Sequence, residues 1–464
     1  MSSTLALAIG AVVVIAIASR GLLLGSPDWG GFARGPESLG YFASVLSIFA
    51  SLAGGFMVFG VVQMGFEGGL SGYIIGATYI FGMGFLYWGM PKVAERVDVK
   101  QGLFGIDQLI KNHYGSKSQI GLYILVSLLF AGVLGGQLLS ISFVLDTFNT
   151  TFNKVILVGV GLILTCGLTI WYGLSGVIIN DIIQGLLVLI IAFILPVYLY
   201  LELGGIDHIR FSPLNNGIGG EYGIVYPLAG FIFLLPTFLV RVDLWQRIRL
   251  HNADNNLLLT CISTGLILSF FYASMTTSGI IVKSNLSELG INPTEKASRL
   301  AINLAAEVIY FEPFLVLVVA GMIIALLSSV ESYLQIVTSS TTKLALWDEI
   351  PDSFEFSDEE NNVVMFNARI IAILVFIVAG IFAFLIPDIV DLLSSAFSVF
   401  GILLPVVLWA IFSSRDSTSD WVACSSFIIS LVICLSSLPF LQELAFIPAV
   451  VAGTLFFGVF LLFD

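Results

Sequence analysis

Apolar runs of 18 or more residues recur along almost the whole length of this chain. In the hydrocarbon of a bilayer, only a helix or a closed barrel satisfies its own backbone, and a barrel strand alternates apolar with polar residues. As a helix, each run is long enough to cross a hydrocarbon core of about 30 Å. Hydrophobic residues make up 58% of the chain and charged residues only 11%. The sequence therefore predicts an all-α polytopic membrane protein and excludes an ordinary water-soluble globule.

Hydropathy predicts about thirteen transmembrane helices and leaves no room for a separate soluble domain. The predicted spans are residues 4–24, 39–64, 68–92, 118–148, 153–172, 175–202, 222–248, 255–282, 313–346, 364–387, 389–412, 418–436 and 444–463. With the N-terminus outside and the C-terminus in the cytoplasm, thirteen of the 18 Lys and Arg residues fall inside. The positive-inside rule favours this orientation. A short surface helix is also expected at 292–310, from its apolar residues at helical spacing.

Two predicted spans contain helix breakers near the middle of the membrane. Ala53-Gly54-Gly55 interrupts the second span, and Gly230 and Pro236 interrupt the seventh, five spans later. Interrupted helices at corresponding positions of two halves are typical of inverted-repeat transporters. The unwound backbone offers carbonyl groups to a cation and amide groups to a solute.

Ionisable side chains inside membrane spans are expensive and therefore count as functional candidates. Asp181 lies in the sixth span, Glu331 in the ninth, and Arg241 with Asp243 near the inner end of the seventh. Structural roles remain open for three of them. Asp181 could cap a helix, and Arg241 could pair with Asp243 or extend to the interface.

Hydroxyl groups surround Glu331 at helical spacing. Ser328, Ser329 and Ser332 place hydroxyls beside this carboxylate on one side of the helix. Such hard oxygen ligands suit an alkali cation or a proton. The alternative is structural, because membrane serines also bond carbonyls one turn earlier or allow close helix packing.

Four segments resemble stretches of the solute:sodium symporter family, whose members include sodium/proline, sodium/sugar and sodium/sialic acid symporters. The segments are DWGGFARGPESLGYFASVLSIFAS, YGLSGVIINDIIQ, VDLWQRI and LSSVESYLQIVTSS, in that order. The second departs from the family signature at Leu174 and Asn180. The resemblance covers residues 4 to about 440.

The resemblance implies one transmembrane transporter domain over residues 1–464 with a LeuT-like core. Ten helices at 39–412 would form five plus five inverted repeats, preceded by an extra helix at 4–24 and followed by two helices at 418–463. It implies a Na⁺ site between core helices 1 and 8. The implied ligands are carbonyls of Ala50, Ala53 and Ala325 and hydroxyls of Ser328 and Ser329.

A second cation or proton site is implied at Asp181, Glu331 and Ser332. Glu331 stands where family members with a sodium pair carry serine, so a second cation and a proton both remain open. An acidic residue there resembles the proline-transporting branch. However, Leu52 replaces an aspartate of that branch, which argues against proline as the solute.

The family's solute lies beside the interrupted helices. The corresponding residues here are Gly54, Phe56, Met57, Gln137, Arg241 and Gln335. Arg241 could bind a solute carboxylate through two parallel hydrogen bonds, or it could form an inner gate with Asp243. Amino acids, other small carboxylates, sugars and polyols all fit this set.

The sequence thus predicts a sodium-coupled secondary active symporter that imports a small organic solute across the plasma membrane, with Na⁺ as coupling ion. Proton-coupled symport on the same fold and a solute sensor with a separate partner are the alternatives. Enzyme activity is not expected, because the three histidines lie in loops. The net charge of −13 argues against nucleic-acid binding. The acidic cytoplasmic loop 348–361 is either a solvated tether or a regulatory contact.

Overall fold

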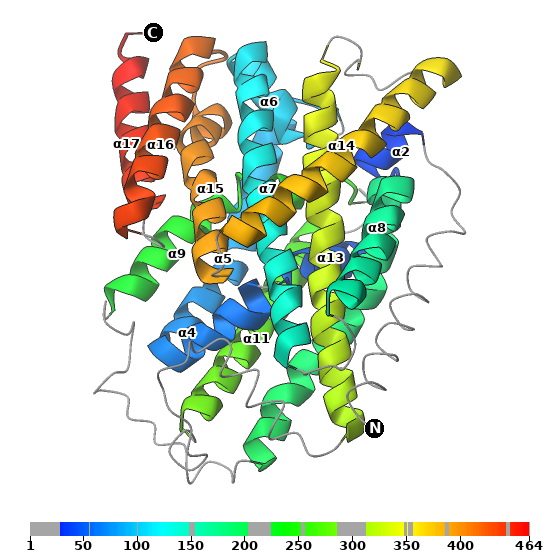
Figure 1. Cartoon of the computed structure of the whole chain (residues 1–464). Coiled ribbons are helices and arrows are strands. Elements are labelled where there is room, and N and C mark those ends of the chain that lie inside the picture. Colours follow the sequence, from blue (N-terminus) through cyan, green and yellow to red (C-terminus); the bar gives the residue numbers. More distant parts are fainter. Residues whose placement is uncertain are drawn as a thin grey trace.

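The computed structural model describes residues 28–463 except 55, 100, 148–153, 203–223, 252–255, 285–311, 348–349, 351–355, 386–388 and 442–445. The described part is almost entirely helical (Figure 1). Its elements are α2 (Trp29–Arg34), α3 (Tyr41–Leu52), the π-helix η1 (Phe56–Gly60), α4 (Val61–Gly68), α5 (Ser71–Ala94), α6 (Ile106–His113), α7 (Ser116–Thr147), α8 (Lys154–Glu202), α9 (Val225–Thr237), α10 (Val242–Ile248), α11 (Leu257–Ser284), α13 (Glu312–Ala345), α14 (Asp358–Leu385), α15 (Ile389–Phe412), α16 (Asp420–Leu441) and α17 (Phe446–Leu461).

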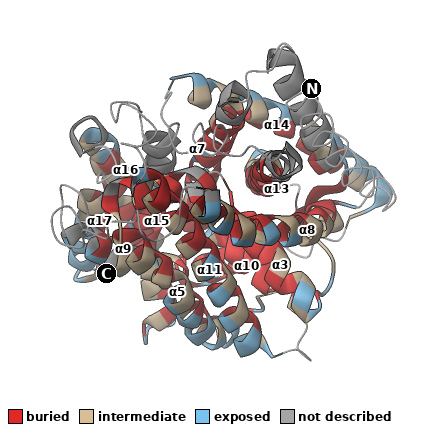
Figure 2. Ribbon diagram, turned by 90° about the horizontal axis from the view of Figure 1, so that it is seen from below, coloured by how far each residue is buried: buried red, intermediate tan, exposed pale blue. Residues whose placement is uncertain are grey.

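The exterior of the bundle is apolar. Six of the described helices are long and apolar enough to cross a membrane. Phe366, Ile370, Ile373 and Ile377 on α14 are all exposed, an arrangement that lipid favours and water does not. Exposed residues lie around the outside, whereas α3, α10 and α13 carry mostly buried residues (Figure 2). The candidate site therefore lies in the interior of a membrane-embedded helical bundle.

The second predicted span is interrupted at Ala53 and Gly54, as the sequence predicts; we call this the first break. Helix α3 ends at Leu52, Ala53 leaves helical geometry at ψ 47°, and the chain resumes as η1 and then α4. The Gly54 amide donates to the Leu52 carbonyl over 2.9 Å, a turn too tight for an α-helix.

The seventh predicted span is interrupted at residues 238–241, which we call the second break. Pro236 in the last turn of α9 removes a backbone donor. Arg241 has extended backbone angles (φ −75°, ψ 101°) and serves as the N-cap residue of α10. The prediction of two interrupted helices is therefore confirmed for both spans, but Gly230 was wrongly named as a breaker, because it lies inside α9.

The predicted spans 153–172 and 175–202 both lie in α8, which the non-helical backbone of Gly173 divides into two helices joined at a sharp kink. The φ of Gly173, 55°, lies in the left-handed region that glycine tolerates. A β-carbon at Gly173 would also lie only 2.4 Å from the carbonyl oxygen of Phe32. The kink thus follows both from backbone conformation and from the close approach of α2.

The short helices α2 and α6 and the start of α14 were not predicted. Helix α2 buries Trp29, Phe32 and Ala33 at the end of the bundle that also holds α6 (Figure 1). Helix α14 begins at Asp358 rather than at 364. Its Ser357 and Glu360 bond each other's backbone amides in a capping box, which hydropathy does not detect. The predicted span 4–24 and surface helix 292–310 lie outside the described residues.

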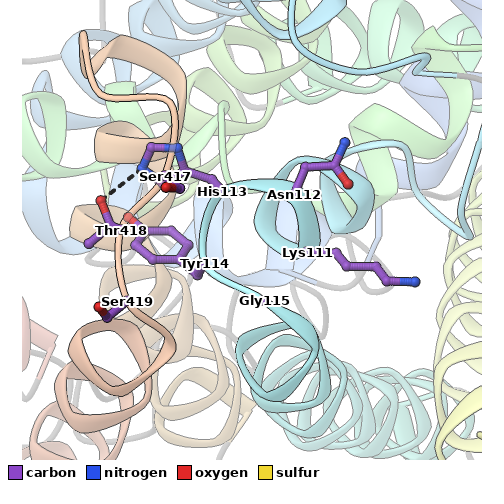
Figure 3. Close-up of a pocket in the computed structure, with 8 residues that line it drawn as sticks. All are labelled: Lys111, Asn112, His113, Tyr114, Gly115, Ser417, Thr418 and Ser419. Carbon is purple, nitrogen blue, oxygen red and sulfur yellow. Dashed lines mark hydrogen bonds between the residues drawn. The ribbon is translucent and has the colours of Figure 1, made fainter.

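A surface pocket lies where α6 meets the loop before α16 (Figure 3). His113 at the end of α6 is hydrogen-bonded through Nε2 to the Thr418 hydroxyl over 3.1 Å. Burial, together with the nearby positive charge of Arg96, lowers the pKa of His113 to about 4. The ring is therefore neutral at physiological pH.

Candidate cation and solute site

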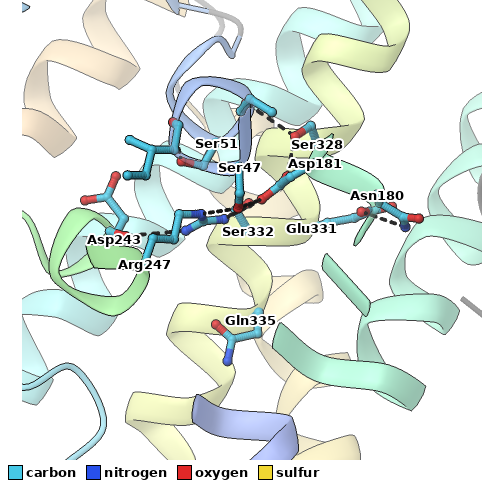
Figure 4. A network of polar contacts seen from close by, with 12 residues as sticks. Ser47, Ser51, Asn180, Asp181, Asp243, Arg247, Ser328, Glu331, Ser332 and Gln335 are labelled. Atoms are coloured by element: carbon cyan, nitrogen blue, oxygen red, sulfur yellow. Dashed lines mark hydrogen bonds and ion pairs between the residues drawn. The ribbon is translucent and has the colours of Figure 1, made fainter. Parts of the chain in front are cut away.

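The C-terminal end of α3 meets α13 and α8 at a buried serine. The Ser328 hydroxyl lies 3.3 Å from the Ala50 carbonyl oxygen and donates to Asp181 Oδ1 over 2.7 Å. All three residues are almost fully buried (Figure 4). The carbonyl of α3 and the hydroxyl of α13 that the resemblance implies as sodium ligands are therefore close neighbours.

Ser329 supplies a second hydroxyl on the same helix, beside the first break. Its Oγ is buried and, within the part of the chain that the structure describes, has no hydrogen-bond partner. A β-carbon at Gly54 would lie 2.3 Å from this oxygen. Buried polar groups without partners are rare, so this hydroxyl is suited to coordinate an ion such as Na⁺. Ala53 and Ala325 are also buried, and the roles of their carbonyls stay predictions.

The residues of the implied second cation or proton site divide into two groups. Asp181 Oδ2 and the Ser332 hydroxyl both accept hydrogen bonds from Arg247, over 2.8 and 2.7 Å. Glu331 instead accepts a bond from the Asn180 side-chain amide over 3.2 Å. Figure 4 shows Glu331 pointing away from Arg247 toward α8. The carboxylates of Asp181 and Glu331 therefore have different partners.

Arg247 is the main site residue that sequence reasoning missed. Arg247 is one of the thirteen Lys and Arg residues that the predicted topology places on the cytoplasmic side, yet its side chain is fully buried. Its Nε also donates to the Ser47 hydroxyl over 3.1 Å. A signal was present, because Leu244, Trp245 and Ile248 are apolar neighbours of Arg247 in the short helix α10. A charge in such surroundings needs a partner.

Four of the six predicted solute residues, Gly54, Phe56, Met57 and Gln137, lie at the first break. Gln137 Nε2 would be 3.0 Å from a β-carbon at Gly54, and both Gln137 and Met57 are buried. Phe56 begins η1, and its side chain lies outside what the structure describes. The first break therefore presents a glycine backbone, an amide side chain and a thioether.

The other two predicted solute residues have partners elsewhere. Arg241 binds both carboxylate oxygens of Asp243, over 3.2 and 2.6 Å, and stacks its cation 5.4 Å from the centre of the Phe400 ring. Of the two roles left open for Arg241, this geometry matches the pair with Asp243. Gln335 donates to the carbonyl of Ala33 on α2 and accepts a bond from Gln246 on α10.

These amide contacts join three helices that are distant in the sequence. Gln246 also donates to the Ala33 carbonyl, over 3.1 Å, so α2, α10 and α13 are joined by two glutamines. Every residue of α10 is buried. On the other side of the first break, the Tyr333 hydroxyl donates to the carbonyl of Ser51. The described residues thus hold α10 and α2 tightly against α13.

Comparison with known proteins gives one match to a family model and matches to solved structures. Residues 32–213 match the family model described as the sodium:solute symporter family. The fold matches a solved sodium-coupled sialic acid symporter in a substrate-bound, outward-open state, with a TM-score of 0.79, 16% identity and coverage of 98% of each chain. It also matches a nucleobase-cation-symport-1 family transporter in a closed conformation, with a TM-score of 0.52, 14% identity and 93% coverage of each chain. A search of curated protein sequences gives no match.

The fold is the LeuT-like fold of these two solved proteins, which confirms the predicted fold class. The family model matches residues 32–213 of this chain, in agreement with the resemblance seen in the sequence. The long apolar helices are those of a multi-pass membrane protein. The described residues do not test the count of thirteen spans.

Proposed function

We propose that this protein is a sodium-coupled secondary active symporter that imports a small organic solute by alternating access. The observation that carries the proposal is the junction at Ser328. One hydroxyl on α13 contacts both a carbonyl at the end of α3 and a carboxylate on α8, beside the partnerless Ser329 hydroxyl. Oxygen atoms from separate helices that converge in this way are what a bound Na⁺ requires.

In this mechanism Na⁺ binds the carbonyls of Ala50, Ala53 and Ala325 and the hydroxyls of Ser328 and Ser329. Its binding holds α3 against α13 and fixes the geometry of the first break. The solute then binds along Gly54, Met57 and Gln137. By linkage, Na⁺ strengthens solute binding and solute strengthens Na⁺ binding by the same factor.

Release to the cytoplasm requires the inner contacts to separate. We propose that α10 and α2 move away from α13, which breaks the bonds between Gln246, Gln335 and Ala33. With the N-terminus outside and the C-terminus in the cytoplasm of the plasma membrane, each inward Na⁺ gains about 2.3 kcal/mol per 100 mV of membrane potential. The membrane potential thus drives solute accumulation.

The contacts of Arg241 bear on how a solute carboxylate could bind. Both carboxylate oxygens of Asp243 already bind this guanidinium, so a solute carboxylate would have to displace Asp243. We retain amino acids, small carboxylates and sugar-like compounds as candidate solutes. Gln137 and the backbone at Gly54 are suited to bind the polar groups that these compounds share.

The acidic segment 348–361 is proposed as a regulatory contact. Asn361 at its end accepts a hydrogen bond from the Trp29 amide over 2.7 Å, which connects the start of α14 to α2. A partner that binds the acidic residues would therefore displace α2, which in the proposed mechanism helps to close the inner side. Asn361→Ala should change transport rate without changing Na⁺ affinity.

Proton coupling is the second candidate and is favoured by Glu331. This carboxyl group is buried in α13 and bonded to the neutral amide of Asn180 rather than to a cation. A group in such surroundings can carry a proton at mid-membrane depth. Under this alternative, ligand binding would respond to pH, and Glu331→Gln would remove the response.

The deciding experiment is thermal unfolding of the purified protein in NaCl, KCl and choline chloride at equal ionic strength. A ligand at ten times its Kd stabilises by about 1.4 kcal/mol, which raises Tm measurably. We expect a rise with Na⁺ alone, lost in Ser328→Ala and Ser329→Ala. Ser340→Ala is the matched control, because Ser340 is a buried serine of the same helix that bonds carbonyls in its own helix and Ser127.

Equal Tm values in all three salts would contradict sodium coupling. A pH-dependent response that is lost in Glu331→Gln would then support the proton-coupled alternative. Loss of the Na⁺ response in Ser340→Ala as well would show that the serine variants act through helix packing rather than through ion binding.

A further inference from the structure

The guanidinium of Arg247 lies in a pocket of oxygen atoms contributed by three other helices. Asp181 Oδ2 on α8 is 2.8 Å away, the Ser332 hydroxyl on α13 is 2.7 Å away, and the Ser47 hydroxyl on α3 is 3.1 Å away. Figure 4 shows these side chains converging on Arg247 from around it. The side chains of Arg247 and Asp181 are both fully buried, so neither charge is screened by water.

This pocket has the ligands of an alkali-cation site. Carboxylate and hydroxyl oxygens from separate helices are hard ligands of the kind that Na⁺ prefers. However, the positive charge among them belongs to the protein. A metal ion bound to Asp181 would lie within a few ångströms of the guanidinium, and like charges repel strongly where water is excluded.

We propose that Arg247 is a built-in cation that takes the place of a second coupling ion beside Asp181, so that the transporter binds one Na⁺ per cycle. The proposal rests on the proposed function, because it concerns the ion that the transporter carries. It makes Arg247 a determinant of stoichiometry, since its charge stays with the protein while the single Na⁺ crosses the membrane.

The pocket also has a positioning role toward the bound Na⁺. The Ser328 hydroxyl hydrogen can go to Asp181 Oδ1 at 2.7 Å or to the Ala50 carbonyl at 3.3 Å. The shorter, charge-assisted bond to the carboxylate is the stronger one. With its hydrogen held there, the Ser328 oxygen keeps its lone pairs available for the proposed Na⁺. Arg247 holds the Asp181 carboxyl group in place, so Arg247 and Asp181 are positioning residues for Ser328.

The test is the number of Na⁺ ions bound per purified chain, measured with radioactive sodium at saturation. We expect one for the wild type and two for Arg247→Met, because the vacated oxygens of Asp181, Ser47 and Ser332 would then accept Na⁺. The double variant Arg247→Met/Asp181→Asn should bind one again. Arg247→Lys should also bind one, since it keeps the charge.

Arg241→Met is the matched control, because Arg241 is the other arginine of this region and pairs with Asp243 instead. Its sodium count should stay at one. Two ions on the wild type, or one on a folded Arg247→Met, would overturn the proposal. The number of Na⁺ ions bound by the wild type is measured without any variant. A count of two therefore overturns the proposal even if Arg247→Met fails to fold. No bound Na⁺ on the wild type would instead contradict the proposed function itself.

Discussion

The first and second breaks lie in corresponding helices of the two halves of the LeuT-like fold, yet their chemistry differs. The first break contains only Ala53 and Gly54 among its described residues and presents bare backbone to the hydroxyls of α13. The second break and the helix α10 after it carry three charged residues within seven positions, Arg241, Asp243 and Arg247, all of them paired. Symmetry of the fold thus provides two unwound segments, of which one suits a mobile ion and the other carries fixed charges.

The charges at the second break also differ from each other. Arg241 pairs with Asp243, two residues along the chain, so this pair moves as one unit. Arg247 pairs with Asp181 on α8 and with serines on α3 and α13, so it ties together elements that are distant in sequence. Four predictions test the two breaks and their surroundings, and they are given in order of decreasing effect.

The largest effect is expected for Arg247→Met. This substitution leaves the Asp181 carboxylate buried without its cation, which typically costs about 3–5 kcal/mol. Chemical denaturation in detergent without Na⁺ would measure the loss. The double variant with Asp181→Asn should recover most of it, because both charges are then absent. Equal losses in the single and double variants would show that the pair contributes little.

Gly54→Ala should have the next largest effect. The added β-carbon would lie 2.3 Å from Ser329 Oγ and 2.9 Å from its β-carbon, so α3 and α13 must shift apart. Overpacking of this kind costs about 1–3 kcal/mol. We expect the stabilisation by Na⁺ to disappear in the same variant. Gly84→Ala is the control, because nothing lies within 4 Å of its added β-carbon. An unchanged Na⁺ response in Gly54→Ala would remove the first break from the ion site.

A smaller loss is expected for Arg241→Met. Asp243 would remain buried, but it lies in the first turn of α10, where the helix dipole stabilises a negative charge. We estimate a loss of about 1–2 kcal/mol in the same unfolding assay, because the dipole offsets part of the cost of a broken buried pair. A loss as large as that of Arg247→Met would eliminate the distinction between the local and the long-range arginine.

The smallest effect concerns pH and lies outside both breaks. The pKa of His113 is lowered to about 4, so between pH 6.5 and 4 the unfolded chain binds a proton that the folded chain does not. Stability should therefore fall as the pH is lowered through this window. Tm measured from pH 7 to pH 4 should fall less in His113→Gln.

The sequence predicted what depends on local backbone chemistry. Both breaks were predicted from Gly54 and Pro236, because glycine and proline limit helical geometry wherever they occur. Ser328 and Ser329 were predicted from helical spacing and the family resemblance, and the structure brings Ser328 to the carbonyl of Ala50. The pairing of Arg241 with Asp243 was among the stated alternatives.

What depends on contacts between distant segments was not predicted. The partner of Arg247 lies 66 residues earlier on another helix, and hydropathy gives no information about such a pairing. For the same reason Asp181 and Glu331 were assigned to one site, although Arg247 binds the first and Asn180 the second. The start of α14 was placed too late, because capping by Ser357 is a hydrogen-bond effect rather than a hydrophobic one.

The kink at Gly173 has a consequence for how strictly Na⁺ flux is coupled to solute uptake in the proposed symport. The α-hydrogen of this glycine is all that separates α8 from the Phe32 carbonyl of α2, so any side chain there would push α2 outward. In the proposed symport, a gap between α2 and its neighbouring helices would allow Na⁺ to cross the membrane without solute. Gly173→Ala should therefore give liposomes that leak sodium while solute uptake declines. If sodium flux without solute stays at the wild-type level, α2 contributes nothing to closing the inner side.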